Sequence, residues 1–242
     1  QVEDAAGRAL DSTRTAEDGT FTIRVPTRAD AYPLTVTASG GSDALTGTPR
    51  ALTLIGLVPA PGVSRVLVSP FSTLLLRRAE CAAGLAGADP SGVRAARHAV
   101  GAADAAVLEP WSFGLPAPLL GRLPSGVPAD PRERSALLAA SAALGETLRR
   151  TATGLVATAD PMDPDTLLMA LACDLIDGDL DGAASEAHAR ASALFVTSMA
   201  GVLTELVQGR ATVDGAAAGS ALDAATQGIF GGPGTGVALL PV

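Results

Sequence analysis

The sequence contains no lysine and no asparagine, and arginine supplies all 17 of its basic residues. A chain without lysine has no Schiff-base amine, no phosphate-loop lysine and no Ser-Lys dyad. A chain without asparagine carries no N-linked glycan. Aromatic residues make up only 3% of the sequence, which argues against stacked binding sites for sugars or single-stranded nucleic acid. The lack of lysine thus excludes several classes of enzyme, whereas the scarcity of aromatic residues only argues against stacked binding sites.

The chain is acidic, with a formal net charge of −8 and a pI of about 4.7. This charge argues against a nucleic-acid partner, because phosphates attract basic surfaces. Apolar runs are shorter than the roughly 18 residues that a membrane-spanning helix needs, so we expect no transmembrane segment. The first residue is Gln1 rather than methionine, and we therefore expect a processed chain whose export signal has been removed.

Residues 1–68 carry the pattern of short β-strands. Residues 15–20 are turn-forming, and Phe21–Val25 then alternate strictly between apolar and polar side chains. Three more segments read as strands: residues 32–38, 51–58 and 63–68. Glycine and proline separate them, which predicts a β-sandwich. Few residues precede the first hairpin, so we expect this sandwich to lack a strand and to expose an unpaired edge.

The period of the pattern changes at Ser69-Pro70, which is a typical helix start with a serine cap and proline in the first turn. We expect a helical domain over residues 69–228. Its predicted helices cover residues 70–84, 90–106, 131–154, 164–175, 182–208 and 213–227. A proline-rich connection over residues 110–131 is too long for an ordinary loop, so we expect it to pack along the helices.

Residues 18–26, with the sequence DGTFTIRVP, resemble the hairpin of transthyretin-like (prealbumin-like), carboxypeptidase-regulatory-like β-sandwiches. Residues 68–74 resemble the V-[TS]-P-[LF]-[TS]-T-L phrase that joins such a sandwich to a helical domain in one group of these proteins. Residues 174–182 resemble an acidic phrase that is frequent in that helical domain. The family's upstream G-x-V-x-D-G-P segment is missing from this sequence.

The resemblance implies an α+β protein. Its parts would be an N-terminal transthyretin-like β-sandwich, an all-α helical domain and a short C-terminal extended tail. Because such sandwiches occur in secreted and surface bacterial proteins, the resemblance also implies export to the cell surface or the extracellular space. Modules of this kind are usually adhesive, structural or spacer elements.

Four carboxylates lie close together at Asp174, Asp177, Asp179 and Asp181. The last three alternate in the way that the first oxygen ligands of a calcium loop do. His188 stands where the loop should end in a bidentate glutamate, so the match is broken. We favour a helix end with a glycine turn and an aspartate cap, and we keep calcium as the alternative because close carboxylates repel one another. No other cofactor is expected.

The sequence has two cysteines, Cys81 and Cys173, both in predicted helices. An even count in an exported chain favours a disulfide between them, and two buried thiols are the alternative. The two histidines, His98 and His188, lie in alanine-rich helical stretches outside any known nucleophile or zinc motif. We therefore expect no catalytic residues, and a hydrolase would need a serine and a carboxylate beside one histidine.

Residues 229–242 join a glycine-rich hinge to a short apolar end. Val237, Ala238, Leu239 and Leu240 form an extended segment that could complete the unpaired edge of the sandwich by β-augmentation. Docking on another copy would be head-to-tail, and such contacts close into rings or grow into filaments. The alternative is that the tail folds back on its own chain.

The sequence therefore predicts a non-enzymatic, exported bacterial subunit with a structural or adhesive role that self-associates by β-strand exchange. The alternative is a monomeric, lipoprotein-type surface module that binds a ligand, with or without calcium. In that case the groove between the two domains, or residues 111–120, would hold the ligand.

Overall fold

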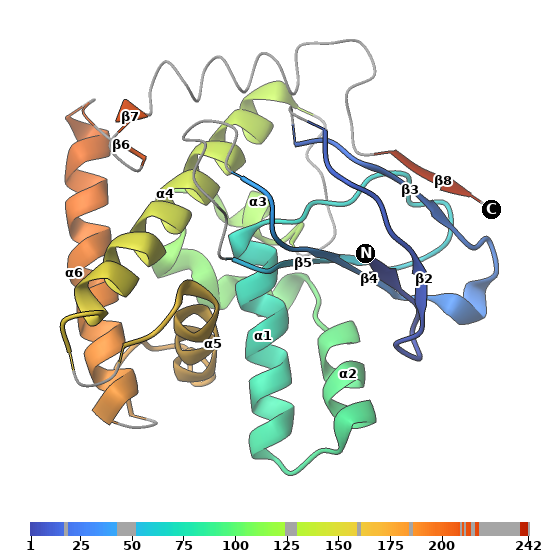
Figure 1. The fold of residues 1–242 in the computed structure, drawn as a ribbon, viewed down its shortest axis with the longest axis horizontal. Coiled ribbons are helices and arrows are strands. Elements are labelled where there is room, and N and C mark those ends of the chain that lie inside the picture. Colours follow the sequence, from blue (N-terminus) through green and yellow to red (C-terminus); the bar gives the residue numbers. More distant parts are fainter. Residues whose placement is uncertain are drawn as a thin grey trace.

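A computed structural model describes residues 1–16, 19–42, 52–123, 130–158, 161–183, 186–208, 210, 212–213, 216–217 and 238–241. The fold is α+β, with a four-stranded antiparallel sheet at the N-terminus followed by helices (Figure 1). The sheet lies on one side of the molecule and the helices on the other.

The four-stranded sheet has the order β2-β1-β4-β5. Its strands are β1 (Val2–Glu3), β2 (Ala9–Asp11), β4 (Leu34–Ala38) and β5 (Leu54–Val58). The register pairs Val2 with Val36 and Leu34 with Val58. Strand β3 (Thr22–Val25) belongs to a separate two-stranded sheet with β8 (Ala238–Pro241). The strands predicted over residues 21–25, 32–38 and 51–58 are therefore present, at residues 22–25, 34–38 and 54–58.

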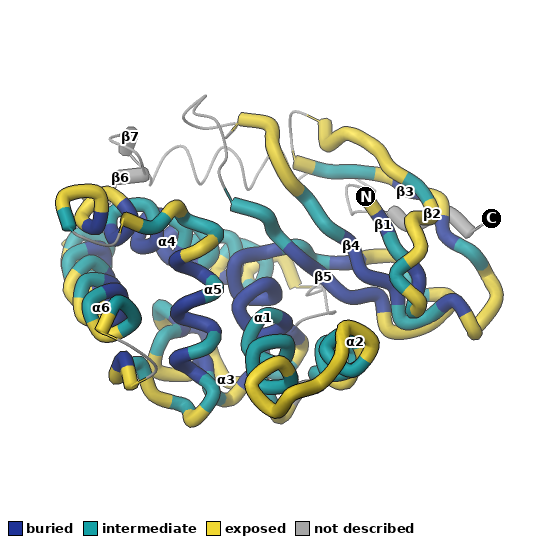
Figure 2. The backbone as a smooth tube through the Cα atoms, turned by 60° about the horizontal axis from the view of Figure 1, so that its bottom comes forward, coloured by how far each residue is buried: buried dark blue, intermediate teal, exposed yellow. Residues whose placement is uncertain are grey.

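Both faces of the four-stranded sheet are covered, and Figure 2 shows β4 and β5 as its most buried strands. On one face, Val2, Leu34 and Val36 share an apolar cluster with Ile23 and Val25 of β3. On the other face, a second cluster joins β5 to Leu76 of helix α1 (Pro70–Leu85). Burial on both sides explains why residues 54–58 are almost continuously apolar instead of alternating.

The predicted strand at residues 63–68 is wrong. These residues are irregular, and a single bridge between Ile55 and Ser69 is the pairing near them. The segment crosses the sheet at Gly56 rather than lying beside a strand: a methyl group added there would fall 2.4 Å from the carbonyl oxygen of Leu67. Val66 is nevertheless buried in the sheet's apolar cluster, so the alternating valines reflect packing and not strand pairing.

Four main helices follow α1: the first three begin at capped prolines, and the last three end near the predicted residues. They are α2 (Pro90–His98), α4 (Pro131–Leu155), α5 (Pro164–Asp174) and α6 (Glu186–Val207). The side chains of Ser69, Asp89, Asp130 and Asp163 each accept a backbone N–H of the first turn, with proline in the next position. These four caps explain why the first residues of these helices could be predicted from the sequence.

Two helix predictions are wrong in extent. The helix predicted to reach residue 106 ends at His98, because Gly101 is extended and a 3-10 helix, η2 (Ala102–Trp111), follows it. The helix predicted over residues 213–227 begins instead as a small hairpin of β6 (Thr212–Val213) and β7 (Ala216–Ala217). The rest of that segment lies outside the described residues.

The proline-rich connection packs along the helices, as predicted. It includes the end of η2 and the short helix α3 (Ala117–Leu120), and its leucines enter the main helical core. The buried members are Leu115, Leu119, Leu120 and Leu123.

Polar side chains at the start of α1 join the sheet to the helices. The Ser72 hydroxyl donates to the Ile55 carbonyl at 2.6 Å, and the Ile55 N–H donates to the Thr73 hydroxyl at 2.7 Å. Near the start of α5, the backbone N–H and the hydroxyl of Thr53 both donate to Asp165, at 2.6 and 2.7 Å. Strand β5 is thus fixed to two different helices.

Candidate functional site

The candidate site is the strand pair formed by β3 and β8, because it joins segments from the two ends of the chain. Ile23 and Val25 of β3 are 2% and 4% exposed, whereas Thr22 and Arg24 are exposed. The strand therefore has one face in the core and one in solvent. Its backbone groups at the open border need a partner strand.

Strand β8 supplies that partner in parallel orientation. The register pairs Thr22 with Ala238, Ile23 with Leu239, Arg24 with Leu240 and Val25 with Pro241. Figure 1 shows β8 alongside β3 at the border of the sheet region, close to the C-terminus. The strand predicted at residues 237–240 is thus present at Ala238–Pro241, while Val237 lies outside the described residues.

The pairing occurs within one chain, which is the predicted alternative in which the tail folds back on its own molecule. The predicted segment and the predicted acceptor edge are both used, but by the same molecule. Exchange between molecules therefore stays a prediction.

Besides its pairing with β8, strand β3 is held in place by side chains from neighbouring segments. The Arg24 N–H donates to the Asp11 carboxylate at 3.1 Å, so a side chain of β2 contacts the backbone of β3. The Tyr32 hydroxyl donates to the Pro26 carbonyl at 2.8 Å, just after the strand ends. These contacts fix the position of β3 independently of the tail.

Residues 2–11 form two strands, β1 and β2, that no pattern in the sequence predicted. Asp4, which is 1% exposed, accepts hydrogen bonds from the backbone N–H groups of Ala6 and Arg8 and from the Arg8 guanidinium. The backbone N–H of Arg8 is the main reason that the pKa of Asp4 lies below its usual value. The sequence signal that could have predicted this turn is Asp4 followed three residues later by Gly7, which adopts a φ of +78°. The described sheet thus obtains two strands from residues 2–11.

The four predicted calcium ligands have different roles in the structure. Asp174 is buried at the end of α5 and accepts from the Gly182 N–H at 2.9 Å and from the Ser192 hydroxyl at 2.6 Å. Asp177 and Asp181 each accept a backbone N–H two residues ahead, from Asp179 and from Ala183. These contacts match the turn-and-cap interpretation. Across the part of the chain that is described, no three His, Cys, Asp or Glu side chains are grouped as metal ligands. Calcium binding stays a prediction.

Cys81 of α1 and Cys173 of α5 form a disulfide, with their Cα atoms 5.4 Å apart. The bond closes a loop between residues 92 positions apart. Restricting so long a loop in the unfolded chain contributes about 2–4 kcal/mol to stability. It therefore holds together the two helices to which β5 is anchored.

The two histidines lie in different parts of the molecule. His98 ends α2, and its Nε2 lies 3.3 Å from the Thr35 hydroxyl on the sheet. Burial, reinforced by the charges of Arg97 and Arg94, lowers the pKa of His98 to about 4. His188 lies in the first turn of α6, beside α5. The contact that His98 makes is with a threonine of the sheet rather than with a nucleophilic serine.

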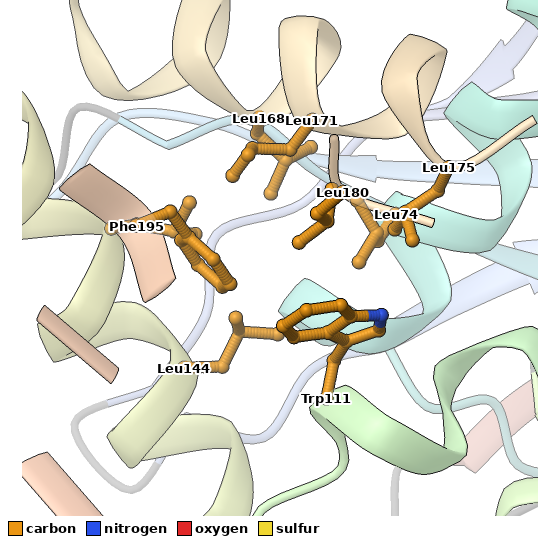
Figure 3. Close-up of a pocket in the computed structure, with 9 residues that line it drawn as sticks. Leu74, Trp111, Leu144, Leu168, Leu171, Leu175, Leu180 and Phe195 are labelled. Carbon is orange, nitrogen blue, oxygen red and sulfur yellow. The ribbon is translucent and has the colours of Figure 1, made fainter. Parts of the chain in front are cut away.

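Trp111 and Phe195 face each other edge-on across the helical core, with ring centroids 6.4 Å apart (Figure 3). The void beside them has a volume of about 10 Å³ and is lined entirely by leucines and these two rings. A volume of that size holds at most about one water molecule. Residues 111–120 therefore contribute to a packed core here.

Helix α6 is relevant to the prediction that the chain has no membrane-spanning segment. By length and composition alone it could cross a membrane, and 28% of its apolar stretch is buried in the structure. One face, with Phe195 and Met199, packs in the helical core, while Val196 and Val207 are exposed. The predicted absence of a span stays a prediction.

Comparison with known proteins gives no match to a family model, to a curated sequence or to a solved structure.

Proposed function

We propose that this protein is a non-enzymatic, exported subunit of the bacterial cell surface or extracellular matrix. Its role is structural or adhesive, and it associates head-to-tail when β8 of one molecule pairs with β3 of the next. The observation that carries the proposal is the parallel pairing of β3 with β8, which uses a strand from each end of the chain.

The length of chain before β8 permits exchange. Residues 218–237 separate β7 from β8. A fully extended segment of that length reaches roughly 65 Å, at about 3.3 Å per residue. β7 and β8 lie on opposite sides of the molecule (Figure 1), so this reach allows the fold-back and is also long enough to reach a neighbouring molecule. The same strand can therefore be delivered to a neighbouring molecule.

The energetics also permit exchange. A swapped strand makes the same backbone hydrogen bonds with β3 of another chain as it makes with its own. The difference in free energy between the two arrangements is then set by connection entropy and by protein concentration. The high local concentrations of a surface layer favour the exchanged form.

A finer proposal concerns the N-terminal fold. We infer a transthyretin-like sandwich in which β3 and β8 form a second layer over the four-stranded sheet. What supports it is the shared apolar cluster, in which Ile23 and Val25 of β3 lie with Leu34 and Val36 of β4. Two sheets that bury their inner faces against each other are the basic unit of a sandwich.

Mixing two single-cysteine variants tests the exchange. Thr22 and Ala238 are register partners, so Thr22→Cys is mixed with Ala238→Cys under mild oxidation. Exchange predicts a covalent dimer on non-reducing gels that contains one chain of each variant. Homodimers of either variant alone should be far weaker, because identical positions are not partners.

A matched control uses partners inside the four-stranded sheet. Ala38 pairs with Leu54 across β4 and β5. A mixture of Ala38→Cys and Leu54→Cys should give no mixed dimer, because these strands pair within one chain. The proposal is wrong if the Thr22 and Ala238 variants also give none at concentrations where the double variant forms its internal disulfide.

A further inference from the structure

A helical hairpin at the surface, residues 77–98, contains no buried residue. This outer hairpin consists of the second half of α1 and the whole of α2, and all of its residues are described. The burial of α1 changes abruptly within the helix, because residues 70–76 are all buried and residues 77–85 are not. Figure 2 shows the outer hairpin in teal and yellow beyond the dark-blue start of α1. Segments with few buried apolar contacts are those that open while the rest of a fold stays intact.

Polar contacts and one covalent bond attach the outer hairpin to the rest of the molecule. The Arg78 guanidinium donates to two carbonyl oxygens just after α5, at 2.7 and 2.9 Å. Arg94 donates to a carbonyl oxygen of the turn between β1 and β2, and His98 contacts a threonine hydroxyl of β4. Water can replace hydrogen bonds of this kind, so each contributes little net stability. Water cannot replace the disulfide between Cys81 of the hairpin and Cys173 of α5.

The disulfide is accessible from solvent on the side of Cys173. Both cysteines are half-buried, and Cys173 lines an open surface groove of about 400 Å³ beside α5. Met169 lines the same groove, one helical turn before Cys173 on the same face of the helix. Among the described residues, Cys173 lines this groove and Cys81 does not. The groove therefore favours approach to the sulfur of Cys173.

We propose that Cys173 is a site of thiol–disulfide exchange, at which a small thiol enters the groove and releases the outer hairpin. The attacking thiolate forms a new S–S bond with Cys173 Sγ while the bond between the two cysteines breaks. The electron pair of the broken bond leaves on Cys81 Sγ as a thiolate, which then takes up a proton. The products are a mixed disulfide at Cys173 and a free thiol on the hairpin, so this step needs no further oxidant or reductant.

The rest of the fold has other connections that survive the exchange. The start of α1 is hydrogen-bonded to Ile55, and Asp165 near the start of α5 accepts from Thr53, so both helices stay attached to β5. The buried half of α1 also remains in the apolar core. Exchange at Cys173 should therefore free the outer hairpin and leave the sheet folded. This inference does not depend on strand exchange by β8.

Mass mapping of the folded protein after a brief exposure to glutathione tests the site. Acid stops the exchange because it protonates thiolates, and the two cysteine peptides are then analysed for the adduct. We expect glutathione on Cys173 and a free thiol on Cys81. An adduct on Cys81, or no adduct until denaturant unfolds the protein, would overturn the proposal.

Two variants test the route through the groove. Met169→Trp places a large side chain beside Cys173 and should slow the exchange several-fold. Leu85→Trp is the matched control, because Leu85 is 75% exposed and lies four residues after Cys81 on α1. It crowds the other sulfur and leaves the groove open, so the rate should stay that of the wild type. Melting curves check that both variants fold, and equal rates in the two variants would contradict the route.

Amide hydrogen exchange tests the release of the outer hairpin. The double variant Cys81→Ser, Cys173→Ser lacks the bond and should lose protection over residues 77–98 while β4 and β5 keep theirs. Wild-type protein treated with glutathione should show the same pattern, and the double variant should not respond to the thiol. Protection that is unchanged over residues 77–98, or lost throughout the sheet, would contradict the release.

Discussion

At the scale of single residues, His98 and Thr35 join helix α2 to the sheet. Thr35 is 1% exposed on β4, and its hydroxyl lies 3.3 Å from His98 Nε2. Arg94, on the same helix, donates to the Ala6 carbonyl at 2.8 Å. The neutral imidazole suits this contact because two arginines stand nearby. Protonation of His98 would place a third positive charge there.

This arrangement makes the stability of the fold depend on pH. The pKa of His98 is about 4 in the folded protein and near 6.5 in the unfolded chain. Between these values the unfolded chain binds more protons, so the free energy of unfolding should fall as the pH drops from 6.5 to 4. Urea unfolding at several pH values measures this slope.

The variant His98→Gln should flatten the slope in that window, because glutamine does not titrate. Thr35→Val is the control: it removes the hydroxyl and keeps the histidine, so the slope should persist. Unchanged slopes in His98→Gln would show that other groups cause the loss of stability.

Structural features that depend on residues adjacent in the chain could be predicted from the sequence. The caps at Ser69, Asp130 and Asp163 were readable because a cap and its proline are adjacent in the chain. The hydrogen bonds between Thr53 and Asp165 could not be predicted from the sequence, because the two residues lie 112 positions apart.

At the scale of elements, β5 shows how a close approach fixes the course of the chain. Gly56 lies at the centre of this strand, and the Leu67 carbonyl crosses directly over it. Any side chain at position 56 would displace residues 63–68 and the apolar contact of Val66. A strand prediction from alternation alone could not detect this crossing, which is why residues 63–68 were misassigned.

Gly56→Ala should therefore destabilise the fold by about 3 kcal/mol, because the added methyl would lie 2.4 Å from a backbone oxygen. Gly145→Ala, in the middle of α4, is the matched control. Nothing lies within 4 Å of a methyl at position 145, so alanine should stabilise that helix by up to about 1 kcal/mol. Chemical unfolding of both variants measures the difference. Equal effects at the two positions would contradict the described crossing.

At the scale of the whole molecule, the sheet and the helices are linked by β5, α1 and α5. The start of α1 bonds to β5, Asp165 of α5 bonds to Thr53, and the disulfide joins the two helices. The order of sheet and helices was predictable, since the hydrophobic period changes at Ser69-Pro70. The partner of β3 could not be predicted in the same way. The sequence predicts an unpaired edge and an apolar strand, but it does not determine whether the two belong to the same molecule or to different molecules.

Light scattering of the protein across a range of concentrations, compared with a chain shortened by residues 237–242, tests head-to-tail exchange of β8 most directly. Head-to-tail exchange predicts that the full chain forms assemblies whose masses are multiples of 24.0 kDa and grow with concentration. It predicts that the shortened chain stays at the mass of a single molecule. A full chain that remains monomeric at every concentration, or assemblies that persist after the shortening, would contradict it.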